Sequence, residues 1–314
     1  MLKEGASILD KRTPTLTLEP NKNYWDKSRI PKATFVFDNV ISKAEALEEV
    51  AKGGKVDIVT ELSPAEAIEI AKSKKAHVVA SKSKTILVGV FNENAPKSKW
   101  LDADLRRALN EAVDRPALVR DAAKGYGSII PSMITPGSVG YDASLKSYGY
   151  EPAAAGKKLA AAGITSVTVV ATEAQKPIVD ALTTSMKAAG VKVVADYSGK
   201  PKADGSWDLW LVEHFDWSPD YSYGVVTREF FGKDGGFRKM PEDPKFEALG
   251  AKIVATTNPV AQKKLVTELD RYIHDQANVL FLYAPSKLYA VSNRVNFVPY
   301  RTTMLELAET TLKK

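Results

Sequence analysis

The spacing of apolar residues predicts a chain of alternating strands and helices. Short runs that are apolar throughout, or at every second position, are typical of strands. They lie at residues 15–18, 33–40, 56–59, 77–81, 85–91, 166–172, 191–196, 207–213, 278–285 and 287–300. Segments with apolar residues three and four positions apart predict helices at residues 43–54, 64–75, 105–114, 115–123, 153–162, 177–190, 246–255 and 259–277. This order indicates an α/β protein, with a right-handed parallel crossover between residues 166 and 196.

Local signals set the predicted starts of two helices. Ser42 precedes Glu45 by three residues, which is the spacing of an N-terminal capping box. Ser63 is followed by Pro64, a residue favoured at the first position of a helix. Between residues 125 and 142, glycine and proline predict an irregular but ordered loop. Its apolar side chains are expected to be buried, namely Ile129, Ile130, Met133 and Ile134.

The segment HFDWSPDYSYG, residues 214–224, directly follows the predicted strand at residues 207–213. Its mixture of acids, aromatics and a histidine suits a pocket for a polar organic ligand. In open α/β sheets, ligands favour the carboxyl ends of strands. A carboxylate there can form a charge-assisted hydrogen bond with an ammonium group, and aromatic rings supply flat apolar walls. The candidate binding residues are His214, Phe215, Asp216, Trp217, Tyr221 and Tyr223.

Most of these residues also have an ordinary structural interpretation. Asp216 can cap a helix or turn, and Trp217 can belong to the core. His214 lies two residues from Asp216, so both side chains would share one face of an extended strand. His214 is either a satisfied structural residue or a contact to a ligand carboxylate or metal chelate. Tyr221 and Tyr223 either line a cleft or lie on the surface.

The charge distribution does not point to nucleic acid. The 314 residues include 44 Lys and Arg against 38 Asp and Glu, for a formal net charge of +6. The lysines are scattered among acids, as in EAIEIAKSKK, which is typical of a solvated surface. No nucleic-acid partner is therefore expected. Arg106, Arg107 and Arg115, on the predicted helices, are likewise expected to be solvated or to cap helix ends.

Missing residue types and motifs exclude several functions. The chain has no cysteine, which excludes disulfides and thiol catalysis, and its three histidines make a dedicated metal site unexpected. A nucleophile elbow, a phosphate-binding loop and a metal-binding histidine pair are all missing from the sequence. We expect no enzyme activity, no cofactor and no resident metal. Because the first twenty residues lack a signal-peptide core and no apolar run could span a membrane, the chain as written is expected to be neither exported nor membrane-embedded.

Several motifs in a fixed order resemble one protein family. They are LTLEPNKNYW, GGKVDIV, VGVFNENAP followed by LRRALNEAVDRPALV, GYGSIIPSMITPGSVGYD, and YGYEPAAAGKKLAAAGI. The chain from about Leu16 onward is similar to the extracytoplasmic solute-binding proteins of the peptide/nickel ABC importers, which include the dipeptide and oligopeptide binders. The resemblance implies a type II periplasmic-binding fold, α/β in class, truncated so that the N-terminal part of the family fold is missing.

In that family, two lobes close on the ligand. The resemblance implies that residues 1–85 are a remnant of the first lobe, that residues 86–287 form the second lobe, and that residues 288–314 return to the first. Tyr24 and Trp25 are then expected to pack within the first lobe. The family's second lobe carries an aspartate–aromatic pair at the end of a strand, and Asp216-Trp217 matches it. The resemblance thus implies that Asp216 meets the ligand's ammonium group.

The implied partners are a peptide-like solute and an ABC permease in the membrane, and the implied location is the periplasm. The alternative is a truncated module that no longer binds solute. In that case an uncovered sheet edge of the first lobe would mediate self-association.

Overall fold

The computed structural model describes residues 15–82, 84–215, 227–299, 307 and 309–313. The chain forms two compact units. The first unit comprises the described residues up to Ser81 and from Lys287 onward, and the second comprises those from Lys82 to Ser286. The assignment of these units to the two lobes of the family stays a prediction.

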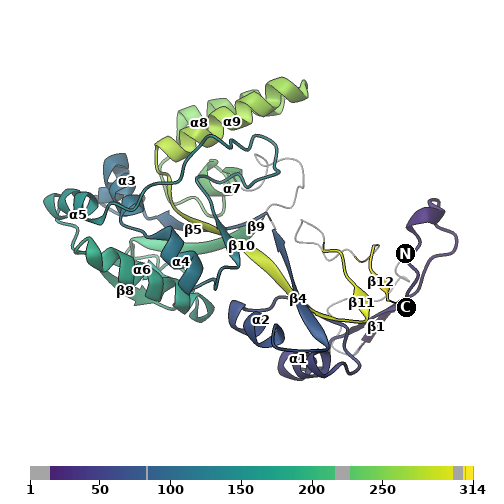
Figure 1. Ribbon diagram of the computed structural model, residues 1–314. Helices are drawn as coiled ribbons and strands as arrows, with labels where there is room; N and C mark the ends of the chain where they lie inside the picture. Colours follow the sequence, from purple (N-terminus) through teal and green to yellow (C-terminus); the bar gives the residue numbers. More distant parts are fainter. Residues whose placement is uncertain (1–14, 83, 216–226, 300–306, 308, 314) are drawn as a thin grey trace. The chain divides into compact units, whose positions relative to one another are not determined.

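The second unit is built on a mixed sheet with the strand order β10-β5-β9-β7-β8 (Figure 1). β5 is antiparallel to both β9 and β10, whereas β7 is parallel to β8 and β9. The β7–β8 pair confirms that the predicted strands are parallel. Short β6 pairs with β10 beside this order. The bounds of the strands are β5 Thr85–Phe91, β6 Gly127–Ile129, β7 Ser166–Val170, β8 Lys192–Asp196, β9 Leu209–Phe215 and β10 Val279–Ser292.

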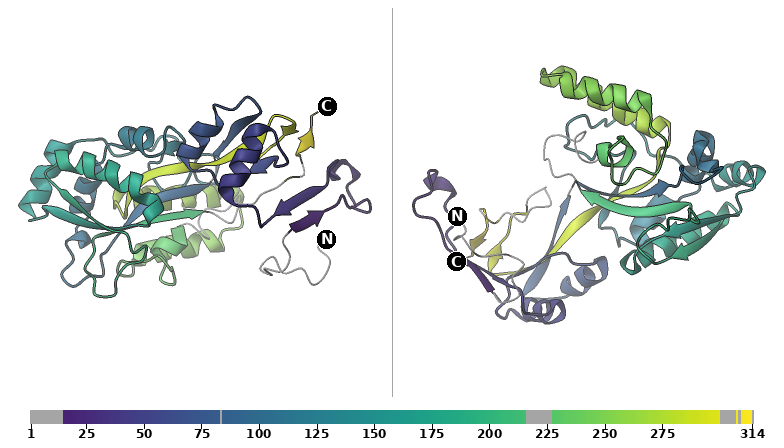
Figure 2. Two further views of the ribbon diagram at one scale, coloured as in Figure 1. Left: turned by 90° about the horizontal axis from the view of Figure 1, so that it is seen from below. Right: turned by 180° about the vertical axis from the view of Figure 1, so that it is seen from behind.

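Helices cover both faces of this sheet, on opposite sides of the strands (Figures 1 and 2). Ile86, Val88 and Val90 of β5 point into one hydrophobic core with α7, α8 and α9. Leu87 and Phe91 point into the other core, with α3, α4, α5 and α6. The fully buried run at residues 85–91 therefore contributes to two cores by simple alternation. The bounds of the helices are α3 Ala103–Glu111, α4 Arg115–Asp121, α5 Pro152–Ala161, α6 Lys176–Ala188, α7 Arg228–Phe231, α8 Pro244–Ala255 and α9 Pro259–Asp275, with single 3₁₀ turns η2 Lys99–Leu101 and η3 Glu173–Gln175.

The first unit is smaller and has short strands. β1 pairs with β2 in a two-stranded antiparallel ribbon, and β3 and β4 each pair with β10. One of its hydrophobic clusters contains Tyr289, Val291, Val295 and Phe297, from β10 and the residues after it. The bounds are β1 Thr15–Leu18, η1 Lys27–Arg29, β2 Phe35–Asp38, α1 Lys43–Lys52, β3 Ile58–Val59, α2 Pro64–Ile70, β4 Ala76–Lys82, β11 Val295–Asn296 and β12 Thr311–Leu312.

Both predicted helix starts are confirmed. The Ser42 hydroxyl accepts a hydrogen bond from the Glu45 amide, and α1 ends at Gly53 in the left-handed region, with a φ of 75°. Ser63 and Glu66 form a reciprocal capping box at the start of α2. α2 ends at Ile70, five residues earlier than predicted.

Other predictions were wrong in detail. The two strands predicted at residues 278–285 and 287–300 are one continuous strand, β10, which ends at Ser292. Within the loop at residues 125–142, Ile130, Met133 and Ile134 are buried as predicted, but Ile129 is exposed because it ends β6. Trp25 is 80% exposed, so it does not pack within the first unit. Among the described helices, none is long and apolar enough to cross a membrane.

Candidate ligand-binding site

The candidate site begins at the carboxyl end of β9, which is two residues longer there than predicted. All seven residues of β9 pair with β5, so that His214 lies opposite Ile86 and Phe215 opposite Thr85. This pairing extends the strand beyond the predicted end at Glu213. His214 and Phe215 are both half-buried, and the backbone ladder fixes their position.

His214 lies among aromatic rings. Its ring centroid is 5.0 Å from that of Phe237 and 5.7 Å from that of Phe230, both in edge-on geometry, and 5.7 Å from that of Phe215. Its Nε2 atom is buried and has no hydrogen-bond partner. Burial lowers the pKa of His214, against the opposing effect of the Glu229 carboxylate. His214 is therefore not a fully satisfied structural histidine, because Nε2 has no hydrogen-bond partner. Its lowered pKa favours the neutral imidazole.

A tight loop after α7 holds the aromatic wall in place. Phe237 stacks on Phe230 with the ring centroids 5.0 Å apart, and the Phe237 amide donates to the Glu229 carbonyl at 3.0 Å. The Gly236 amide donates to the Glu229 carboxylate at 3.1 Å. A Cβ atom at Gly235 would lie 2.5 Å from the carbonyl oxygens of residues 228 and 229, so only glycine fits there.

Four of the six predicted site residues cannot be placed. Asp216, Trp217, Tyr221 and Tyr223 lie outside the described residues. Their roles in ligand binding stay predictions. The structure brings together only the first two members of the set, His214 and Phe215, with aromatic residues from α7 and the following loop.

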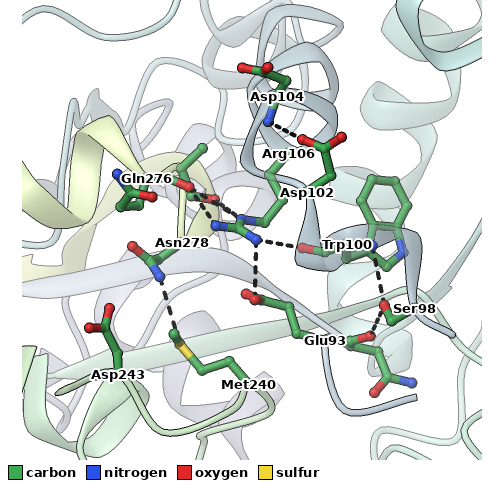
Figure 3. Close-up of polar contacts among 12 residues, drawn as sticks. Glu93, Ser98, Trp100, Asp102, Asp104, Arg106, Met240, Asp243, Gln276 and Asn278 are labelled. Carbon is green, nitrogen blue, oxygen red and sulfur yellow. Dashed lines mark hydrogen bonds and ion pairs between the residues drawn. The ribbon is translucent and has the colours of Figure 1, made fainter. Parts of the chain in front are cut away.

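Of the two expectations for Arg106, the solvated side chain was wrong, whereas helix capping is supported, because Arg106 donates to the carbonyl of Gln276 at the C-terminal end of α9. Its guanidinium is buried and contacts the Glu93 carboxylate at 3.1 Å (Figure 3). It also donates to the carbonyls of Trp100, Gln276 and Ala277. Arg106 thus links η2 and the segment after β5 to the turn between α9 and β10. These bonds engage all three guanidinium nitrogens, which indicates a structural clamp and not a ligand-binding cation.

The carboxyl group of Glu93, the acid of this clamp, has a strongly raised pKa. Burial raises the pKa of Glu93 to about 7, the Arg106 guanidinium opposes this shift, and the Asp243 carboxylate adds to it. Asp243 lies near this cluster in Figure 3 and accepts a hydrogen bond from the Tyr272 hydroxyl at 2.7 Å. Breaking a buried pair of this kind is costly because it leaves one uncompensated charge.

Arg115 is also buried and not solvated, but it fits the alternative expectation of helix capping, because it donates to the carbonyl of Asn110 in the last turn of α3. It donates to the Phe281 carbonyl at 2.7 Å and to the Asn110 side-chain oxygen at 2.8 Å. The same Asn110 oxygen accepts the Phe281 amide at 3.1 Å. This arrangement fixes the α3–α4 connection to β10. Arg107, in contrast, is partly exposed and pairs with Asp104, as expected for a solvated helix face.

One residue beside the site was not predicted. Lys84 directly precedes β5, is 8% exposed, and has no hydrogen-bond partner for its ammonium group. The only sequence signal was a lysine immediately before a continuous apolar strand. No group of three or more His, Cys, Asp or Glu residues that could hold a metal ion is found in the part of the chain that the structure describes.

Comparisons with known proteins agree with this fold. A family model described as "Bacterial extracellular solute-binding proteins, family 5 Middle" matches residues 5–235. Heme-binding protein A of Haemophilus influenzae is 22% identical over 277 residues, which cover 82% of this chain and 49% of that protein. Di/tripeptide-binding protein 1 of Pseudomonas aeruginosa is 23% identical over 254 residues, which cover 72% of this chain and 46% of that protein. The chain spans about half the length of these curated relatives.

Among solved structures, the ABC transporter substrate-binding protein CtaP of Listeria monocytogenes superposes with a TM-score of 0.79 at 18% identity. The match covers 96% of this chain and 64% of that one. At this identity the likeness concerns the fold alone. It confirms the predicted type II periplasmic-binding fold, and about a third of the CtaP chain has no counterpart here.

Proposed function

Because the chain belongs to the bacterial extracellular solute-binding proteins of family 5, we propose that it forms part of the substrate-binding protein of an ABC importer. It would bind a small solute, pass it to a membrane permease outside the cytoplasm, and catalyse no reaction. The observation that carries this proposal is the end of β9, where a neutral imidazole with an unused nitrogen faces an aromatic wall. Small-molecule binding sites in proteins generally combine apolar walls with a few polar groups.

The proposed solute is peptide-like. Asp216 would accept hydrogen bonds from its ammonium group, while Phe215, Trp217, Tyr221 and Tyr223 would supply apolar contacts, and His214 a polar one. The position of His214 and Phe215 at the carboxyl end of a central strand supports this assignment. The names of the curated relatives, which refer to heme and to di- and tripeptides, do not favour the alternative of a module that has lost solute binding.

Binding can be tested by calorimetric titration of the chain with dipeptides, heme and nickel chelates. We expect saturable binding of dipeptides, and Asp216→Asn should weaken it by about 1.5–3 kcal/mol, because a hydrogen bond to a charged group is lost. The matched control is Asp180→Asn, on the exposed face of α6. If Asp216→Asn binds dipeptides as tightly as the wild type does, the assignment of Asp216 is wrong. If heme or a nickel chelate binds and dipeptides do not, the solute belongs to that class and the proposal of a peptide-like solute is wrong.

We also propose that the first unit self-associates. β1 and β2 form a ribbon of only two strands, which is marginally stable by itself. Three apolar residues on or beside it are largely exposed, Trp25, Val36 and Val40. Large apolar side chains exposed on an incomplete sheet favour a protein partner.

A further inference from the structure

The ammonium group of Lys84 is buried without a partner. Its Nζ atom makes no hydrogen bond and no ion pair. Lys84 directly precedes Thr85, which pairs with Phe215 at the end of β9. It therefore lies at the same end of the sheet as His214, in the same compact unit.

A buried ammonium without a partner is unfavourable, because it loses its hydration and gains nothing in return. Native proteins pair such charges with carboxylates or other anions. A second unsatisfied group, the Nε2 atom of His214, lies on the neighbouring strand, where His214 pairs with Ile86, two residues after Lys84. Two unsatisfied nitrogens at one sheet end indicate a position for an anionic group.

The nearby described carboxylates do not fill this position. Glu229 is engaged by the Gly236 amide at 3.1 Å. Glu213, on β9, is exposed and contributes with burial to raising the pKa of Tyr283. Neither forms an ion pair with Lys84. Neither of these described carboxylates therefore compensates the charge of Lys84.

We propose that Lys84, assisted by His214, binds a carboxylate of the solute. This inference rests on the proposed function and narrows it to solutes that carry a free acidic group. The Lys84 ammonium would donate a charge-assisted hydrogen bond to the carboxylate, and the His214 imidazole would donate a second one from Nε2. The apolar rings of Phe215, Phe230 and Phe237 surround His214, and by excluding water they would strengthen its hydrogen bond.

The first test needs no ligand. Thermal unfolding of Lys84→Met is compared with that of the wild type and of Lys82→Met, which replaces an exposed lysine two residues away. We expect Lys84→Met to raise the melting temperature by about 2 °C or more, because the unpaired buried charge is removed. Lys82→Met should leave it unchanged. A lower melting temperature for Lys84→Met would show that Lys84 has a structural partner, such as Asp216, and would overturn the proposal.

The second test uses the dipeptide Ala-Leu and its C-terminal amide, which differ only in the carboxylate. The wild type and Lys82→Met should bind the acid at least tenfold more tightly than the amide. Lys84→Met should lose at least tenfold in affinity for the acid and bind the amide unchanged. Equal affinity of the wild type for acid and amide, or an unchanged affinity of Lys84→Met for the acid, would contradict the inference.

A third measurement separates this inference from the proposed function. Inorganic phosphate replaces chloride at constant ionic strength, and melting temperatures are recorded without peptide. Phosphate should stabilise the wild type and not Lys84→Met, even if peptides do not bind. Equal shifts in both proteins would overturn the anion position, whereas a Lys84-dependent shift without peptide binding would contradict only the peptide proposal.

Discussion

Buried ionisable side chains dominate the second unit at the scale of single residues. Asp270 of α9 is almost fully buried, and one carboxylate oxygen accepts the Ser132 hydroxyl at 2.6 Å. Burial raises the pKa of Asp270 to about 7, although the Ser132 hydroxyl and the amides of Met133 and Ile134 oppose the shift. Its other oxygen has no hydrogen-bond partner. Asp270 therefore stabilises the folded chain mainly in its protonated form.

The raised pKa gives a defined pH dependence. Between the unfolded value of about 4 and the folded value of about 7, the folded state holds a proton that the unfolded state releases, so stability falls as pH rises through this window. For one such group, the free energy of unfolding falls by up to about 1.4 kcal/mol per pH unit. Asp270→Asn should remove this component from the free energy of unfolding measured in urea between pH 4 and 8.

The control for this measurement is Asp180→Asn, an exposed carboxylate, which should keep the wild-type slope. Glu93, whose pKa is also about 7, contributes a similar component that both variants retain. An Asp270→Asn profile parallel to that of the wild type would show that Asp270 is ionised in the folded protein at all these pH values.

The sequence predicted the positions of some individual residues and not those of others. The mixture of residues at 214–224 predicted a site after a strand ending at Glu213, but His214 and Phe215 are the last two residues of that strand, and the site itself stays a prediction. The burial of Arg106 and Arg115 was not predictable. Arg106 donates to the carbonyl of Gln276, 170 residues away in the chain, and Arg115 to that of Phe281, 166 residues away. No local sequence pattern predicts contacts at such separations.

At the scale of elements, local signals were reliable where they depend on adjacent residues. Ser63 and Glu66 satisfy each other's backbone amides at the start of α2. The break predicted near Pro285 was wrong because tertiary pairing overrides it. β6 continues the ladder past this proline, with Gly127 opposite Pro285. A Cβ atom at Gly127 would lie 2.7 Å from the Tyr283 ring, so close approach of the two strands requires glycine.

The capping box of α2 can be tested directly. Ser63→Ala should lower the free energy of unfolding by about 0.5–2 kcal/mol, because the Glu66 amide loses its acceptor. Ser63→Asp, which keeps an acceptor at the cap, should retain most of the stability. The measurement is urea unfolding of the transition that includes the first unit. Equal stability of the alanine and aspartate variants would show that the cap contributes nothing.

At the scale of the whole molecule, the described part of the chain passes from one compact unit to the other after Ser81 and before Lys287. The periodicity of apolar residues predicted most elements of both units. It could not predict which parts of the first unit would remain exposed, because exposure depends on what packs against a strand and not on the strand's own pattern. Val36, on a strand with regular alternation, is 62% exposed.

The proposed self-association is a property of the whole chain. Light scattering after size-exclusion chromatography should show a mass that rises with protein concentration. Val36→Lys should reduce this association, because a charge on an exposed strand disfavours pairing with another chain. Val260→Lys, on the exposed face of α9, is the matched control and should associate like the wild type. A monomer at all concentrations would contradict the proposal.

The continuous strand β10 has a consequence for how the stability of this molecule can be measured. The Phe281 amide is bonded to the Asn110 side chain in the second unit, and the Ser292 amide is bonded to the Asp57 carbonyl in the first. Amide hydrogen exchange at each position is governed by the opening of its own surroundings. The amides of Phe281 and Ser292, eleven residues apart on one strand, thus report on one unit each. The difference between their exchange rates measures whether the two units open together or independently.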